Sequence, residues 1–306
     1  MKLQKSKRLK ILIFGGSGLL GSHLVKNYST DNDVIWTYSS PLKNINNGIS
    51  YVYGDKNSDN ALMNLIEQFN PDVIINAIGL VSVDQCETNF KLAEKLNSKF
   101  VKSIVDILHK IKNNNNCYFV QISSGGVYGN HSESINKSWK EADKLNPLSN
   151  YALTKVQGEW EAKKYLGPKL IIRSDFYGLN YLRQKSSLLS WIIYNTENNI
   201  QMSGWENVFF SPISGNKLSD IIMQCIKRNI EGVFNIGSEN GCSKFEFVEA
   251  VCKKLNLEPN IIKNEVISKI RPRSSILCCK KIKKFISFSC DWKIELEKYI
   301  DDVYLR

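Results

Sequence analysis

The sequence predicts an α/β protein whose main body is a doubly wound parallel sheet, joined to a smaller C-terminal α/β region. Two observations support this fold class. Apolar runs of strand length recur along the first half of the chain and are separated by helical patterns, as in "LKILIF", "DVIWTY", "PDVIINA" and "CYFVQIS". A glycine-rich turn directly follows the first run and leads into a helix. Strands that alternate with helices are typical of a parallel sheet covered by helices on both faces.

Length and composition limit the classes of protein to consider. The chain has 306 residues, enough for one large domain or two unequal ones. Its hydrophobic content of 42% and charged content of 23% are ordinary for a soluble globular protein. The formal charge is +11, but the basic residues are scattered and accompany no nucleic-acid-binding motif. We therefore expect no nucleic-acid partner, and a basic cleft for an anionic small molecule remains open.

The cysteines and the apolar segments indicate a cytoplasmic protein. The eight cysteines form no Cys-x-x-Cys pair and no Cys/His ligand spacing, so we expect free, mostly buried thiols and no metal site. The basic leader runs into only a short apolar strand, too short for the core of a signal peptide. The run "LLSWIIY" is likewise too short to span a bilayer, so we expect no membrane partner.

The turn "GGSGLLG" after the first strand is the first candidate binding site. Its glycines have the spacing G-x-x-G-x-x-G. Glycine permits a tight turn and a close approach of backbone to phosphate, while the helix N-terminus offers free N–H groups to an anion. The alternative is a glycine-rich turn without a ligand, but the position between a strand and a helix favours a dinucleotide. The cofactor-binding residues predicted in this turn are Gly15, Ser17, Gly18, Leu19, Leu20 and Gly21.

The end of the second strand bears on the choice of nicotinamide cofactor. A free ribose 2′-hydroxyl usually meets a carboxylate at this point of the fold. Here the chain offers Ser39 and Ser40, with Lys43 a little further on. Hydroxyls with a cation suit a 2′-phosphate better, so NADP(H) is favoured and NAD(H) is the alternative. Asp55, after the next short strand, either faces the adenine or caps the helix that follows.

Later strand ends supply small and polar residues. Ala77 and Gly79 follow the strand "DVIIN", where small residues let the backbone approach the cofactor. Ser124 directly follows the strand "CYFVQIS", at the edge where doubly wound sheets bind their ligands. It either binds a substrate carbonyl or bonds the local backbone. Asn97 lies within a long amphipathic helix, where it is either exposed or hydrogen-bonded to interrupted backbone beside a site.

Tyr151 and Lys155 form the candidate catalytic pair. They lie in a predicted helix that Ser149 or Asn150 caps and that the Gly167-Pro168 dipeptide stops. Positions i and i+4 share one face of a helix, so the phenol and the ammonium point into the same space. We expect the cation to lower the pKa of the tyrosine, which then donates a proton to a developing alkoxide. The alternative is a tyrosine packed on the core with its lysine in water.

The motifs "GGSGLLG", "NAIG", "ISSGGVYG" and "YALTK" together resemble those of the extended short-chain dehydrogenase/reductases. More narrowly, "PDVIINAIGLVSVDQCE", "PLSNYALTKVQGE" and "RPRSSIL" are similar to the dTDP-4-dehydrorhamnose reductase branch. The resemblance covers nearly the whole chain, with the motifs in the expected order. It implies a dinucleotide-binding, Rossmann-like domain over 8–178, rejoined by parts of 206–238, and a mainly substrate-binding region over 179–306.

The resemblance implies a role for each matching residue. Tyr151 would be the general acid, Lys155 would hold the nicotinamide ribose, and Ser124 would hydrogen-bond the substrate oxygen. Asn97 would take the fourth catalytic position, and Arg173 would lie beside the nicotinamide. Together these roles imply an NAD(P)H-dependent reduction of a 4-keto sugar linked to a nucleoside diphosphate, as in deoxysugar or polysaccharide biosynthesis. A homodimer is a further expectation of the family.

Substrate contacts are assigned to four residues. By resemblance, Val83 and Asp84 would flank the substrate. Arg271 either grips a nucleotide diphosphate through bidentate contacts or lies on the surface. Trp191, in a helix expected to line the cleft, either stacks on a base or sugar or packs in the core.

Departures from the reductase branch keep other functions open. The branch usually has Thr-Asp-Tyr-Val-Phe where this chain has Ser124-Gly125-Gly126-Val127-Tyr128, which is closer to the sugar epimerases. Related dehydratases place an Asp-Glu pair here, and the two glycines offer no such groups, so we do not expect dehydration. Cys278 also replaces a frequent aspartate of the late motif. The alternatives are an epimerase with tightly held NAD and a non-catalytic, nucleotide-binding regulatory subunit.

Overall fold

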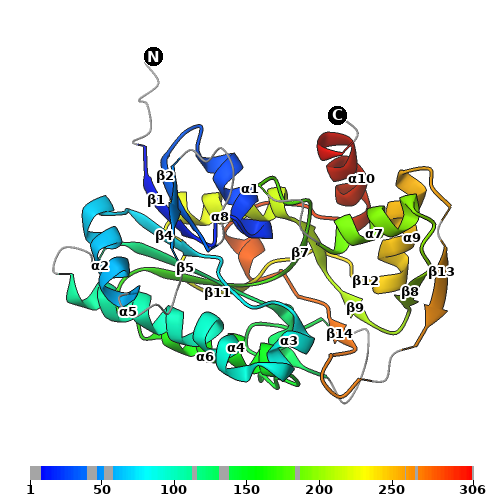
Figure 1. Cartoon of the computed structure of the whole chain (residues 1–306), viewed down its shortest axis with the longest axis horizontal. Helices are drawn as coiled ribbons and strands as arrows, with labels where there is room; N and C mark the ends of the chain where they lie inside the picture. Colours follow the sequence, from blue (N-terminus) through cyan, green and yellow to red (C-terminus); the bar gives the residue numbers. More distant parts are fainter. Residues whose placement is uncertain are drawn as a thin grey trace.

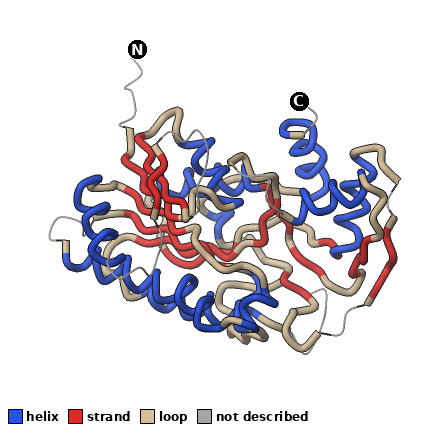
Figure 2. The backbone as a smooth tube through the Cα atoms, viewed as in Figure 1, coloured by secondary structure: helices blue, strands red, loops and turns tan. Residues whose placement is uncertain are grey.

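The computed structural model describes residues 8–39, 47–51, 58–111, 116–130, 138–182, 187–258, 260–265 and 268–304. Figure 1 shows a large sheet with helices on both faces and, beside it, a smaller region near the C-terminus. Figure 2 shows that most of the strands gather in the large sheet, whereas the smaller region contains short strand pairs between helices.

The large sheet has seven strands in the order β11-β6-β5-β4-β1-β2-β3. All neighbours in it pair in parallel. The predicted fold class, a doubly wound parallel sheet, is therefore confirmed. The strands of the sheet are β1 (Lys10–Phe14), β2 (Asp33–Tyr38), β3 (Gly48–Ser50), β4 (Val73–Asn76), β5 (Tyr118–Ser123), β6 (Lys169–Arg173) and β11 (Gly232–Asn235).

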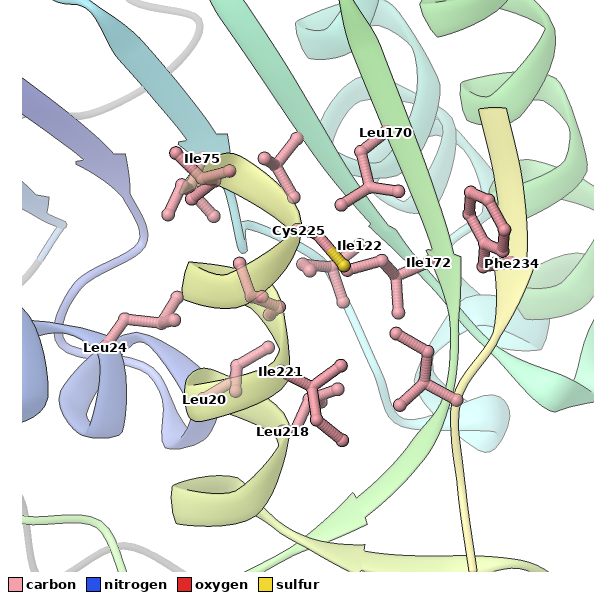
Figure 3. Packing of buried hydrophobic residues seen from close by; sticks show 14 of the residues in the cluster. Leu20, Leu24, Ile75, Ile122, Leu170, Ile172, Leu218, Ile221, Cys225 and Phe234 are labelled. Atoms are coloured by element: carbon pink, nitrogen blue, oxygen red, sulfur yellow. The ribbon is translucent and has the colours of Figure 1, made fainter. Parts of the chain in front are cut away.

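Alternate residues of each strand serve the two faces of this sheet. On one face, Ile11 and Ile13 pack with apolar residues of two helices, α1 (Leu19–Tyr28) and α8 (Gly215–Lys227). On the other face, Leu12 and Phe14 pack against α2 (Ser58–Phe69) and α5 (Phe100–Lys110). Figure 3 shows the first layer from close by, where side chains of α8 meet those of the strands. Burial on both faces explains why these strands are continuously apolar.

The chain returns to the large sheet late in the sequence. β11 is the edge strand beside β6, and α8 packs against α1. Both elements lie mostly within 206–238, the segment expected to rejoin the first domain. The domain limits at 178 and 179 themselves stay predictions.

The C-terminal region has its own apolar core. Buried residues of three helices meet there, among them Ile192, Phe247 and Leu296. Its short strands form one three-stranded sheet, β12-β9-β14, and two two-stranded sheets, β10-β7 and β13-β8. The helices are α7 (Leu188–Glu197), α9 (Lys244–Lys254) and α10 (Trp292–Val303), and the strands are β7 (Asp175–Tyr177), β8 (Met202–Trp205), β9 (Phe209–Phe210), β10 (Pro212–Ser214), β12 (Cys242–Ser243), β13 (Ile261–Asn264) and β14 (Ser274–Ser275).

The helix expected around Asn97 is interrupted. It runs as α4 (Phe90–Glu94), a π-helical turn η1 (Lys95–Lys99) and then α5. π-bulges occur often at functional sites. Four further elements complete the set: α3 (Val83–Thr88), α6 (Asn150–Lys163) and two short 3₁₀ helices, η2 (Gly125–Tyr128) and η3 (Ile282–Lys284).

Two further predictions concern disulfides and membrane-spanning helices. All eight cysteines are free, and all but Cys278 are buried. Among the residues that the structure describes, no helix combines the length and apolar character needed to cross a bilayer.

Candidate active site

The glycine turn between β1 and α1 has the geometry of a backbone cradle. Gly15 has a φ of +80°, a left-handed conformation that favours glycine. The N–H of Gly18 donates to the Gly15 carbonyl at 2.9 Å and closes the turn. A Cβ at Gly21 would lie only 2.1 Å from that same carbonyl oxygen. The turn therefore requires glycine at its start and at its entry into the helix.

The N-terminus of α1 is open to an anion. Gly18 is the N-cap and offers no side-chain oxygen to the helix amides. The amides of the first turn have no acceptor within the helix, and they carry the positive end of the helix dipole. The side chain of Asn180 donates to the carbonyl of Ser17 at 3.0 Å, which braces the turn from the C-terminal side. These features fit a pyrophosphate group.

Among the other predicted cofactor residues, two described ones lie at neighbouring strand ends. Ser39 follows β2 and is exposed. Ser40 and Asp55 lie outside the described residues. Ala77 follows β4 and approaches the glycine turn closely, because a Cβ at Gly15 would lie 3.0 Å from its carbonyl carbon.

Asn97 takes the second of its two predicted placements, because it is buried and bonds interrupted backbone. Its Oδ1 accepts from the Leu80 amide at 2.8 Å, and its Nδ2 donates to the Leu80 carbonyl at 3.1 Å. Nδ2 also lies 3.0 Å from the hydroxyl of Thr154 on α6. A Cβ at Gly79 would lie 3.0 Å from Asn97 Oδ1 and 3.8 Å from Lys155 Nζ. The π turn thus brings Asn97 to the loop after β4 and to the face of α6.

Helix α6 brings the candidate catalytic residues together. Of the two predicted caps, Ser149 is the one used, and its hydroxyl accepts from the Ala152 amide. Tyr151 hydrogen-bonds Ser124 at the end of β5. The ammonium of Lys155 is buried and donates to the carbonyl of Ile122 on β5 at 2.6 Å. We call Tyr151, Lys155, Ser124 and Asn97 the Tyr151 cluster.

The predicted effect of Lys155 on Tyr151 is wrong for this structure. Burial raises the pKa of Tyr151 to about 12, and the nearby Asp175 carboxylate adds to this, whereas the bond to Ser124 lowers it. Burial lowers the pKa of Lys155 to about 8, partly offset by Glu159. Desolvation disfavours both charged forms, and it outweighs the attraction that the helical spacing suggested.

Arg173, predicted to lie beside the nicotinamide, is held by protein groups. Its Nε and Nη2 donate to the two carboxylate oxygens of Glu159 at 2.8 and 2.6 Å. Its Nη1 donates to the hydroxyl of Tyr128 at 2.7 Å. Ser123 donates to Glu159 as well, at 2.7 Å. These contacts favour a structural role, and we call Arg173, Glu159, Tyr128 and Ser123 the Arg173 cluster.

Two of the predicted substrate residues meet although they lie far apart in sequence. One nitrogen of Arg271 donates to both carboxylate oxygens of Asp84, at 2.9 and 2.7 Å. The guanidinium also lies over the ring of Trp205, 5.8 Å from its centroid. Val83 begins α3, the helix that carries Asp84. Trp191 lies on α7 and is 40% exposed, so it is not packed in the core.

Sequence reasoning missed two carboxylates. Glu159 lies one helical turn beyond Lys155, so the same i, i+4 spacing extended along α6 would have found it. Asp175 begins β7, and its Oδ1 lies 3.3 Å from the Ser124 hydroxyl. Its signal is a charged residue just past the end of β6, at the edge where parallel sheets bind ligands.

The fold and the site together define the class: the protein is an NAD(P)-dependent oxidoreductase of the extended short-chain dehydrogenase/reductase type. The model of the RmlD substrate binding domain matches residues 9–305. The chain belongs to this family.

Individual proteins show similarity along most of the chain. The dTDP-4-dehydrorhamnose reductase of Escherichia coli K12 is 20% identical over 97% of this chain and 98% of its own length. A crystal structure of dTDP-4-dehydrorhamnose reductase from Bacillus anthracis in complex with NADP has a TM-score of 0.82 and 19% identity, and the match covers 97% of this chain and 100% of that one. The UDP-glucose 4-epimerase of Thermotoga maritima with UDP-glucose has a TM-score of 0.79 and 17% identity, with 95% and 97% covered.

Proposed function

We propose that the protein uses NADPH to reduce a 4-keto sugar attached to a nucleoside diphosphate. The observation that carries this proposal is the convergence of Tyr151, Lys155 and Ser124 at the carboxyl end of β5, with Lys155 also near Gly79 in the loop after β4. Reductases of dTDP-4-dehydrorhamnose are among the relatives of this chain, and their substrate belongs to this class.

The protonation of the site suits the reducing direction. The pKa of Tyr151 is raised to about 12, so the phenol holds its proton at neutral pH and acts as a general acid. When bound, the cofactor supplies a hydride to the carbonyl carbon. Tyr151 then protonates the carbonyl oxygen, which Ser124 orients. Lys155 holds the nicotinamide ribose of the cofactor, and Asn97 takes the fourth catalytic position beside it.

We propose that the glycine turn binds the cofactor pyrophosphate and that Ser39, Ser40 and Asp55 face its adenosine end. Ser39 and Ser40 offer hydroxyls and no carboxylate at the end of the second strand, which favours NADP(H). The relative from Bacillus anthracis has NADP bound. On the substrate side, we assign the diphosphate to Arg271, the flanking contacts to Val83 and Asp84, and stacking on a base or sugar to Trp191. A cytoplasmic homodimer remains our expectation for the whole enzyme.

The direct test is a panel of nucleotide-linked 4-keto sugars incubated with NADPH or NADH, followed by loss of reduced-cofactor absorbance. We expect turnover with at least one keto sugar and a preference for NADPH. A protein that binds NADPH but oxidises it with no member of the panel contradicts the proposal.

Tyr151→Phe should lower turnover by on the order of a hundredfold or more, because it removes the proton donor while keeping the ring. The matched control is Tyr165→Phe, which removes a buried hydroxyl bonded to the Cys117 carbonyl. We expect the control to lose stability but not turnover. Equal turnover of Tyr151→Phe and wild type would remove Tyr151 from the mechanism.

An epimerase is the second candidate, favoured by the Ser-Gly-Gly sequence at the end of β5 and by the likeness to the Thermotoga maritima enzyme. Such an enzyme uses tightly held NAD to oxidise and then re-reduce its sugar. Cofactor retained through purification, together with sugar interconversion without added cofactor, would favour it. A non-catalytic subunit, the third candidate, would bind the cofactor and turn over no sugar.

A further inference from the structure

A carboxylate from β7 occupies the turn that follows Ser124. Asp175 Oδ1 accepts from the Gly125 amide at 3.1 Å and lies 3.3 Å from the Ser124 hydroxyl. A Cβ at Gly125 would lie 2.7 Å from Asp175 Oδ2. The carboxylate therefore takes the space that a side chain at position 125 would fill, and glycine is needed there to admit it.

The late motif of the sequence holds this carboxylate from the other side. Ser275 belongs to "RPRSSIL", and its hydroxyl donates to Asp175 Oδ2 at 2.6 Å. Ser275 lies in β14, which pairs with β9, while Asp175 pairs with Pro212 of β10. Strands of the C-terminal region thus fix an acidic group against the catalytic serine of the first region.

We propose that Asp175 is a positioning residue that acts through Ser124 and prepares Tyr151 to donate its proton. This inference rests on the proposed function, since it explains how the same site is set for reduction.

The hydrogen bonds give the direction of the effect. A serine hydroxyl has one proton and two acceptor lone pairs. In the free site, that proton of Ser124 is directed at Asp175, and the Gly126 amide donates to the serine oxygen at 3.1 Å. With that proton engaged, the serine oxygen keeps one lone pair with which it can accept from the neutral phenol of Tyr151. The phenol keeps its proton and presents it at the end of β5.

Charge adds to this arrangement. The titratable groups that act on Tyr151 are Asp175 from β7 and Cys86 from α3, and both disfavour its phenolate, while Lys155 lies one turn along α6. Of these groups, Asp175 also forms a hydrogen bond with Ser124.

The test compares the ionisation of Tyr151 in the wild type and in Asp175→Asn. Uniform labelling with 3-fluorotyrosine lets fluorine NMR follow each phenol, and the Tyr151 signal is the one lost in Tyr151→Phe. We expect its titration midpoint to fall by roughly half to one pH unit in Asp175→Asn, because a nearby negative charge is removed. The control Ser275→Ala keeps the charge and should leave the midpoint within about 0.2 unit, since burial and the carboxylate are unchanged.

An unchanged midpoint in Asp175→Asn overturns the inference. If that variant does not fold, Asp175→Ser removes the same charge with a smaller side chain and is titrated instead. The titration needs no sugar, so it separates the two claims: a shifted midpoint in a protein that reduces no keto sugar sinks the proposed function alone. With an active wild type, the alkaline limb of kcat/KM against pH should move down by the same amount in Asp175→Asn. A purely structural role for Asp175 would leave that limb in place.

Discussion

The Tyr151 cluster and the Arg173 cluster share helix α6, and each buries a cation, but they treat that cation differently. Arg173 is 2% exposed, and Glu159 binds it through two hydrogen bonds while Tyr128 provides a third. Lys155 is 5% exposed, and the one hydrogen bond of its ammonium to a described residue goes to the Ile122 carbonyl. An ammonium has three donors, so two of them are left for other groups.

The pKa values follow this difference. The bond and charge of Glu159 hold the pKa of Arg173 above its usual value despite burial. Burial without a bound carboxylate lowers the pKa of Lys155 to about 8. A buried cation with its hydrogen bonds completed stabilises structure, whereas one left incomplete is available to a ligand. This contrast separates a structural cluster from a functional one on the same helix.

The largest effect should come from breaking the Arg173 cluster. Glu159→Gln leaves a buried guanidinium without its counter-charge, and we expect a loss of about 3–5 kcal/mol in the free energy of unfolding, measured with urea. The control is Asp106→Asn, which breaks the exposed pair with Lys102 and should cost less than about 1 kcal/mol. Equal losses in the two variants would contradict the structural assignment of the Arg173 cluster.

Changing the other cation should have the opposite effect on stability. Lys155→Met removes a charge that burial disfavours, so the free energy of unfolding should rise by about 1–3 kcal/mol below pH 8, while turnover falls at least about tenfold. The folded pKa of about 8 lies below the unfolded value of 10.5, so the wild type bears this cost fully below pH 8.

The pH dependence sharpens this comparison. The stability difference between Lys155→Met and the wild type should shrink as the pH rises from 8 through 10.5, because the lysine is neutral in both states only above that range. Lys163→Met, an exposed lysine of the same helix, serves as the control and should show no such trend. A Lys155→Met protein that is less stable than the wild type at pH 7 would show that the ammonium is structurally satisfied.

The smallest effect concerns the start of α6, because Tyr151 lies in the first turn of this helix and Glu159 lies farther along it. Ser149→Ala removes the N-cap and should cost about 1 kcal/mol of stability. Because helix ends fray first, we also expect turnover to fall a few-fold. Asp291→Ala removes the cap of α10 and should cost a similar stability without changing turnover. Equal turnover in both variants would show that the position of Tyr151 does not depend on its cap.

Much of the candidate site could be predicted from the sequence, because short stretches of chain specify it. The glycines of the turn, the serine at the end of β5 and the spacing of Tyr151 and Lys155 are short-range features. Backbone conformation and helical periodicity fix such features within a few residues. The same is true of the alternating strands and helices, whose apolar patterns required a sheet covered on both faces.

Contacts between segments far apart in the sequence could not be predicted from it. Asp175 contacts Ser124 although the two are 51 residues apart in sequence. Arg271 contacts Asp84 at a separation of 187 residues. Nothing in the spacing of these residues relates them. The predicted pKa of Tyr151 failed for a similar reason, since a helical spacing gives a neighbour but not the burial that decides the charged state.

The sequence by itself determined the parallel sheet, the glycine turn after β1 and the helix that carries Tyr151 and Lys155, because each depends on neighbours in the chain. Only the tertiary structure decided which polar groups are buried and which partners complete them. Those outcomes depend on desolvation and on packing between segments. They completed the hydrogen bonds of Arg173 with protein groups and placed Asp175 beside Ser124.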